Sequence, residues 1–259
     1  LDPRGVLDPI RRWEVIAGGP VTAAPILYDG DTLAFASQSG SVFACLAHDK
    51  TFRWSFKADG AIEGDLGIDD AAVYVASADR SLYKLDRRTG ERAWRARFPS
   101  PLTEGPVVAG GLVYQFCRGN GLAALDAKDG KEKWRLAEGH SLAAHSAAGD
   151  VIFSDDARLL TVEHDTGKAM GAINVPDVTS VISNTKDDAV YLLGTGGRVT
   201  CVRLADVPYL RKQQVLAAKQ QLNQSPDSKK KVEPLPPLPK PEPDPRADDP
   251  LRSDKDTKP

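Results

Sequence analysis

Four tryptophans recur at an almost constant interval, and this recurrence constrains the fold more than any other feature of the chain. They are Trp13, Trp54, Trp94 and Trp134, separated by 41, 40 and 40 residues. Met170 takes the tryptophan position in a fifth copy, which reads RLLTVEHDTGKAM, and a sixth copy begins at 198–204. Such self-similarity predicts a repeat architecture in which each copy is one structural unit.

Each copy combines an alternating strand, a tight turn and a strand that carries the tryptophan. In SLYKLDRRTGERAW (81–94), residues 82–85 alternate with the period of two that is typical of a strand. Asp86 can accept hydrogen bonds from turn amides, and Gly90 can adopt the positive φ that a bulged turn needs. The same turn chemistry recurs at Asp126, Gly130 and Gly167.

Further short strands complete each unit, such as 103–108 and 112–117 in the third copy. Four strands in about 40 residues is typical of one blade of a β-propeller. The sequence therefore predicts an all-β fold, a β-propeller of about five four-stranded blades. Each tryptophan supplies a large ring that can wedge between blades, so we expect the tryptophans to be structural and not to stack on a ligand.

The two ends of the repeat region complement each other. The chain enters at a tryptophan-type strand (11–17) and leaves after three strands (178–204) without one. Pairing of these segments would close the ring, because propellers commonly join N- and C-terminal strands in one blade. As an alternative, the stretch 5–13 is a relic of an earlier turn, and the chain is the C-terminal part of a larger propeller.

The composition changes after the propeller region, which we assign to residues 1–206. Residues 207–224 are rich in Ala, Leu, Gln and Lys, which favours a short helix. Residues 225–259 are Pro-rich and charged and have no aromatic side chain, which predicts a disordered tail. The stretch PLPPLPKP (234–241) favours polyproline II and is either a spacer or a ligand for a proline-recognising partner.

Charge and hydropathy exclude several function classes. The net charge of −2 gives no basic excess for nucleic acid, and no apolar run reaches the length of a membrane-spanning helix. The cysteines Cys45, Cys117 and Cys201 are odd in number and far apart, which argues against a disulfide framework. We therefore expect neither a nucleic-acid partner nor a membrane-spanning segment.

The pattern A-L-D-x-x-T-G-x-x-x-W, seen here as KLDRRTGERAW and ALDAKDGKEKW, resembles the tryptophan-docking repeat of quinoprotein-like propellers. That family includes pyrroloquinoline quinone (PQQ) dehydrogenases and a non-enzymatic lipoprotein of outer-membrane-protein assembly. The dehydrogenases carry a disulfide between adjacent cysteines and a calcium site, and neither has a counterpart in this sequence. The resemblance thus implies a member closer to the non-enzymatic type, with no catalytic residue, no cofactor and no metal.

One set of polar residues stands where inner strands would face the axial channel. Aligning the copies places Glu63, Asp65, Glu104 and His145 on the same face of their strands. They could bind a cation or a small cationic ligand, or line a water-filled channel as solvated side chains. We do not expect His140 and His145 to form a metal pair, and we interpret the run 163–165 as turn chemistry.

The sequence predicts a non-catalytic propeller that binds another protein. The resemblance places it in the periplasm or cell envelope of a bacterium, with the cytoplasm as the alternative. Two other functions stay open: a small-ligand or metal-binding sensor that uses the axial channel, and a diverged fragment of a PQQ-dependent dehydrogenase. Propeller faces suit protein recognition because many loops project from one rigid ring.

Overall fold

A computed structural model describes residues 13–49, 51–185 and 189–203. The predicted helix (207–224), the Pro-rich tail (225–259) and the segment 234–241 lie outside these residues. In the described part, no helix has both the length and the apolar character needed to cross a membrane. The described residues form five antiparallel sheets and one short 3-10 helix, η1 (Thr195–Gly197).

The first three sheets each contain four strands in sequence order. Sheet A consists of β1 (Ile26–Tyr28), β2 (Thr32–Ala36), β3 (Ser41–Leu46) and β4 (Phe52–Lys57). Sheet B consists of β5 (Gly67–Ile68), β6 (Ala72–Ser77), β7 (Ser81–Asp86) and β8 (Arg92–Arg97). Sheet C consists of β9 (Val107–Ala109), β10 (Leu112–Cys117), β11 (Gly121–Asp126) and β12 (Glu132–Leu136).

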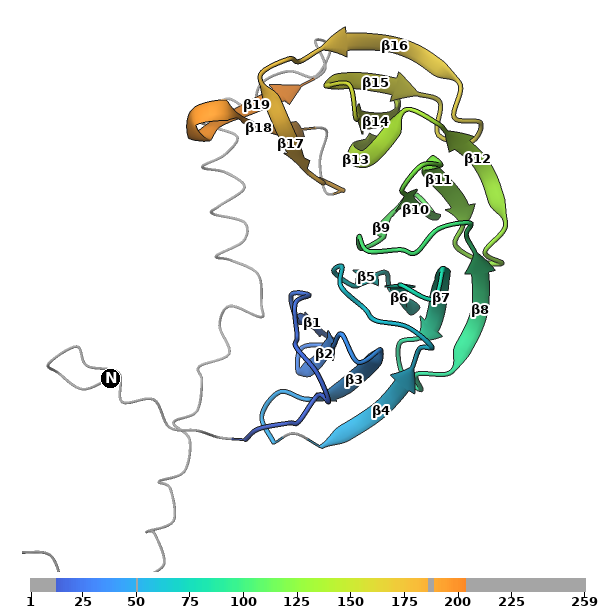
Figure 1. The fold of residues 1–259 in the computed structure, drawn as a ribbon, viewed down its shortest axis with the longest axis vertical. Helices are drawn as coiled ribbons and strands as arrows, with labels where there is room; N and C mark the ends of the chain where they lie inside the picture. Colours follow the sequence, from blue (N-terminus) through green and yellow to red (C-terminus); the bar gives the residue numbers. More distant parts are fainter. Residues whose placement is uncertain (1–12, 50, 186–188, 204–259) are drawn as a thin grey trace, which may run out of the picture. The chain divides into compact units, whose positions relative to one another are not determined.

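The last two sheets differ in their number of strands. Sheet D consists of β13 (Gly139–Ser146), β14 (Gly149–Ser154), β15 (Arg158–Val162) and β16 (Ala169–Asn174). Sheet E has three described strands, which are β17 (Val178–Ile182), β18 (Ala189–Gly194) and β19 (Arg198–Arg203). The sheets follow one another around an arc, with the first strand of sheets A to D innermost and the fourth outermost (Figure 1). This is the architecture of a β-propeller, as the sequence predicts.

The hydrophobic core lies between neighbouring sheets. One cluster joins Val42 of β3 to Val73 and Tyr83 of sheet B, and the next joins Tyr74 of sheet B to Val113 of sheet C. Alternate residues of each strand point to opposite faces, so the inner strands bury apolar side chains on both sides. Each sheet is therefore stabilised by its neighbours and not by a core of its own.

A tryptophan at the outer edge of one sheet bonds to a turn of the next. The indole Nε1 of Trp54 on β4 donates a hydrogen bond to the carbonyl oxygen of Arg87 at 2.9 Å, in the turn that follows β7. The same bond joins Trp94 to Ala127 at 3.2 Å, and Trp134 to His164 at 2.8 Å. The A/B, B/C and C/D junctions are thus each spanned by one indole.

The turns that receive these indoles have the chemistry expected of their sequence. The Oδ1 atom of Asp86 accepts hydrogen bonds from the amides of Arg88 and Thr89, both at 2.9 Å. These amide hydrogen bonds hold the pKa of Asp86 below its usual range. Gly90 closes the turn, with its amide bonded to the Asp86 carbonyl and a φ of 73°.

The D/E junction lacks such an indole. Met170 of β16 stands in the repeat position of the tryptophans, and its exposed fraction is 53%, whereas Trp54 is 6% exposed. Every residue of β16 is exposed. The two sheets share a buried cluster that includes Leu159 of β15 and Val190 of β18, and at their inner ends the amide of Asn184 donates to the carbonyl of Ala143 at 3.0 Å. The outer part of this junction is consequently open.

The predicted pairing of the two ends of the propeller is not observed in the described residues. β19 pairs with β18 and with no other described strand, and residues 13–17 pair with none. Trp13 instead donates its indole hydrogen to the carbonyl of Ala47 at 2.9 Å. The segment 13–17 therefore packs on sheet A, in the same way as each tryptophan-bearing outer strand packs on the sheet that follows it. Ile16 is 90% exposed and Val199 is 65% exposed.

Candidate functional site

The inner ends of sheets B and C form a polar cleft near the axis. It has a volume of about 680 Å³, and its lining includes Glu63, Asp65 and Glu104, three of the four residues predicted to face the channel. The loops before β5 and β9 touch through their backbones, because a Cβ on Gly64 would come within 2.2 Å of the amide nitrogen of Gly105. This contact places the three acidic side chains around one cleft.

His145, the fourth predicted channel residue, lies elsewhere. His145 lies near the end of β13 and pairs with Asp150 on β14. In sheet C the equivalent pair is Val108 of β9 with Val113 of β10, so His145 and Val108 hold the same position in their sheets. Eleven residues separate Trp134 from His145, whereas fourteen separate Trp94 from Val108. The connection into sheet D is thus three residues shorter than the earlier copy, and the alignment that places His145 in the channel is wrong for this reason.

His140 contacts the cleft residue Glu104 instead. Its Nε2 lies 3.1 Å from the Glu104 carboxylate, and its Nδ1 lies 2.6 Å from Asp155. Hydrogen bonding to Glu104 and then to Asp155 raises the pKa of His140 to about 9 against the opposing effect of burial. The ring stacks on Phe116 with centroids 4.1 Å apart. A second polar pocket of about 380 Å³ adjoins Glu104, His140 and Asp155.

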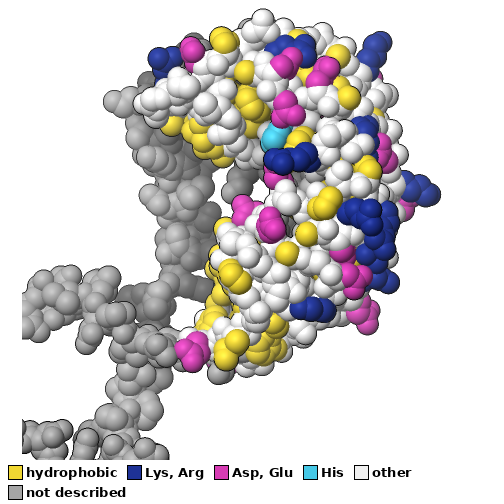
Figure 2. All heavy atoms as spheres, viewed as in Figure 1, with side chains coloured by type: hydrophobic (Ala, Val, Ile, Leu, Met, Phe, Trp, Pro, Cys, Tyr) yellow, Lys and Arg dark blue, Asp and Glu magenta, His cyan; other side chains and the backbone are white. Residues whose placement is uncertain are grey.

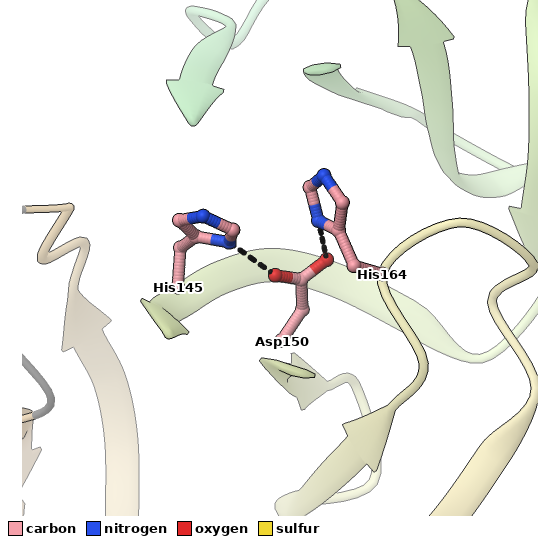
Figure 3. Close-up of side chains that lie close together, drawn as sticks. All are labelled: His145, Asp150 and His164. Carbon is pink, nitrogen blue, oxygen red and sulfur yellow. Dashed lines mark hydrogen bonds and ion pairs between the residues drawn. The ribbon is translucent and has the colours of Figure 1, made fainter. Parts of the chain in front are cut away.

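A separate polar cluster lies between sheets C and D (Figure 3). His145 is the penultimate residue of β13, Asp150 is the second residue of β14, and His164 lies in the turn between β15 and β16. The Nδ1 atom of His145 lies 2.7 Å from Oδ1 of Asp150, and the Nδ1 atom of His164 lies 2.9 Å from Oδ2. Asp150 is fully buried. His140 and His145 contact different carboxylates, Asp155 and Asp150.

Tyr114 of β10 completes this cluster from sheet C. Its hydroxyl donates to Oδ2 of Asp150 at 2.5 Å and lies 3.1 Å from Nδ1 of His164. Burial and the adjacent carboxylate raise the pKa of Tyr114, so the hydroxyl keeps its proton and acts as a donor. The backbone of residues 163–167 does form the predicted turn, but the His164 side chain has a further role that the turn pattern does not reveal.

The open D/E junction forms an apolar cleft of about 520 Å³. Its lining combines Val151 and Leu159 of sheet D with Val190 and Val202 of sheet E. Ile173 of β16 lies at the same cleft and is 56% exposed. Figure 2 shows basic side chains along the outer side of the molecule, over β8 and β12, and hydrophobic side chains at the end formed by sheet E. The apolar cleft thus adjoins the exposed strand β16, which stands where the other sheets carry the indole.

Comparison with known proteins shows similarity to BamB, named an outer membrane protein assembly factor. The family model described as "Outer membrane protein assembly factor BamB" matches residues 8–137 and 83–225. BamB of Yersinia pestis is 25% identical over 189 residues, which cover 64% of this chain and 47% of that protein. The chain thus spans about half the length of that relative.

Two further comparisons bear on fold and activity. The crystal structure of BamB from Moraxella catarrhalis aligns with a TM-score of 0.59 at 20% identity and covers 77% of this chain and 62% of that one. A 1-butanol dehydrogenase (quinone) of Thauera butanivorans is 25% identical over 181 residues, which cover 62% of this chain but 29% of the enzyme. The family match favours the non-enzymatic type over the dehydrogenases, in agreement with the resemblance seen in the repeats.

Proposed function

The chain belongs to the BamB family of outer membrane protein assembly factors, and from this membership we propose that it is a non-catalytic scaffold of the bacterial cell envelope. Its role is to bind another protein during the assembly of outer membrane proteins. The family match over 8–225 supports the role, since it includes all of the described sheets. The propeller fold by itself would not specify a function, because many functions share it.

We further propose that the partner binds at the D/E cleft. The observation that supports this location is the replacement of the docking tryptophan by Met170, which leaves β16 exposed above an apolar cleft. Contiguous exposed apolar surface is typical of protein interaction sites, and methionine adapts to varied partners. The occupant that fits is an extended segment of the partner with apolar side chains, which would lie along β16.

The experiment measures outer membrane protein levels in the bacterium that carries the gene. Deletion should lower these levels, and the wild-type chain should restore them. A chain with Gly171→Glu and Ile173→Glu, two residues of the cleft lining, should be present at the wild-type amount but fail to restore them, since two carboxylates in an apolar contact oppose binding. Phe52→Glu on β4, a residue with 50% exposure, is the matched control and should restore them fully.

The outcomes separate the two parts of the proposal. Unchanged outer membrane protein levels after deletion would contradict the assembly role itself. Full restoration by the double variant would contradict the D/E cleft as the binding site and leave the role intact. If the double variant fails to restore these levels, site-specific photocrosslinking from position 173 should identify the bound protein. Position 52 is the control and should give no adduct.

One specific observation favours a second function, the binding of a small cationic ligand in the axial cleft. Glu63, Asp65 and Glu104 line it, and His140 supplies a single positive charge against Glu104 and Asp155. A thermal-shift screen of small amines and metal ions tests this, because a ligand that binds the folded chain raises its melting temperature. The segment 234–241 lies outside the described residues, and its role as spacer or ligand stays a prediction from the sequence.

A further inference from the structure

The cluster of His145, Asp150 and His164 breaks the residue pattern of the repeat. Asp150 pairs with Val162 across β14 and β15. The residues that hold the equivalent position in the other four sheets are aliphatic: Leu33, Val73, Val113 and Val190. A buried carboxylate is costly unless it is paired or coordinates a cation. The presence of Asp150 at a position that is aliphatic in the other four sheets therefore needs an explanation beyond packing.

Both histidines depart from the repeat as well. His145 occupies the position that Leu27, Ile68 and Val108 hold in sheets A, B and C. His164 follows the first turn residue, a position that Arg87 and Ala127 hold in sheets B and C, and only its backbone carbonyl is needed by the indole of Trp134. Two polar side chains thus stand at positions that are aliphatic in other sheets, and a histidine from the turn after β15 converges on them in space.

The donor atoms of these side chains are those of a transition-metal site. Within the part of the chain that the structure describes, they are the one group of three or more such residues whose ligand atoms converge, all within 4.8 Å of one another. Figure 3 shows both imidazole Nδ1 atoms directed at the two oxygens of the Asp150 carboxylate. Two imidazoles and one carboxylate match catalytic or open zinc sites, which leave a position for water.

The surroundings of the cluster fit an ion. Asp150 is fully buried, while the His145 and His164 side chains are 24% and 22% exposed, so an ion can enter from the side of the rings. Gly110 allows its backbone to pack closely against both rings, since a Cβ at this position would come within 2.6 Å of each, and its carbonyl oxygen lies 3.0 Å from Nε2 of His164, so that Nδ1 is the atom left for an ion. The hydroxyl of Tyr114 orients the carboxylate, as partners of metal ligands commonly do.

We propose that His145, Asp150 and His164 bind one divalent transition-metal ion, with Zn²⁺ as the best match to this donor set. The ion would replace the hydrogens between the two Nδ1 atoms and the carboxylate, and it would join β13, β14 and the turn after β15. This site is independent of the proposed scaffold role and lies outside the axial cleft. The acidic residues Glu63, Asp65 and Glu104 are not ligands of it.

The test titrates the full chain, freed of metal by a chelator, with ZnCl₂ in a calorimeter. One ion should bind per chain, and His145→Gln and His164→Gln should each weaken binding at least about tenfold. His140→Gln is the matched control, because His140 also contacts two carboxylates, and it should bind Zn²⁺ like the wild type. Binding of Co²⁺ should give a visible absorption band that the two ligand variants lose.

A measurement on the wild-type chain makes the test independent of how the variants fold. The chain has four histidines, so ¹⁵N-histidine labelling gives few NMR signals. Zinc should shift the Nδ1 signals of His145 and His164 and leave those of His48 and His140 unchanged. Absence of binding, equal binding by the ligand variants, or a shift of His140 in place of His145 and His164 would each overturn the proposal.

Discussion

The indole of Trp134 lies directly over Gly167, so close that a Cβ on this glycine would come within 2.5 Å of the ring. Trp54 covers Gly90 and Trp94 covers Gly130 in the same way. Each glycine thus meets two requirements at once, a positive φ and the absence of a side chain beneath the tryptophan of the preceding sheet. The repeated turn and the repeated tryptophan are therefore two halves of one contact.

Gly130→Ala should lower the free energy of unfolding by about 2–5 kcal/mol. Its φ is 73°, which costs an L-residue about 1–2 kcal/mol, and the added methyl displaces the Trp94 ring, which costs a further 1–3 kcal/mol. Gly111→Ala is the control, because its φ is 80° but no atom lies within 4 Å of the added Cβ. Urea unfolding measures both, and equal losses would show that the ring contact contributes nothing.

Trp54→Ala should lower the free energy of unfolding by about 3–5 kcal/mol, as expected for removal of a buried aromatic ring. Met170→Ala at the D/E junction should cost less than about 1 kcal/mol, because this side chain is 53% exposed. Chemical denaturation of the two variants compares the junctions directly. A loss at Met170 as large as that at Trp54 would mean that the fourth junction is closed in solution.

The stability of the chain should depend on pH through His140. Its pKa is raised to about 9 in the folded state, from an ordinary value of 6.5. The stabilisation is therefore complete below pH 6.5 and is lost as the pH rises towards 9. The melting temperature of His140→Gln should fall less over this range than that of the wild type, and His48→Gln, at an exposed site, should behave as the wild type. Parallel curves for all three proteins would contradict this assignment.

Tyr114→Phe should lower the free energy of unfolding by about 1–3 kcal/mol, because it removes a hydrogen-bond donor from a fully buried carboxylate. Tyr74→Phe is the matched control. The carboxylate that Tyr74 contacts, Asp69, is half-buried whereas Asp150 is fully buried, so the loss of stability should be smaller. Equal losses in thermal or urea unfolding would show that the Asp150 cluster is no more dependent on tyrosine than the Asp69 turn.

The sequence was sufficient for the features that recur in every copy. Strand β7 and the turn at Asp86 follow from alternation and turn chemistry, and they appear where the pattern predicts them. The tryptophan spacing indicates the number of sheets. These features are local, or they repeat at a fixed interval, so a single copy predicts the others.

Features that occur in one copy alone could not be predicted from the repeat pattern. The connection before β13 is three residues shorter, which moves His145 away from Glu104 and towards Asp150. The Asp150 and His164 contacts depend on which side chains meet across β13, β14 and a turn, and no regular spacing records this. The signal that could have found them is a carboxylate in the aliphatic column of Val73 and Val113, once the shortened copy is aligned correctly.

The missing indole between sheets D and E also determines which sheet unfolds first. Because every sheet depends on contacts with its neighbours, the final sheet is the least firmly anchored, and its amide hydrogens should exchange with solvent before those of sheets B and C. A polypeptide that fills the gap would act as the absent wedge. When it binds, amide hydrogen exchange should slow throughout sheet E and not only at the residues that it contacts.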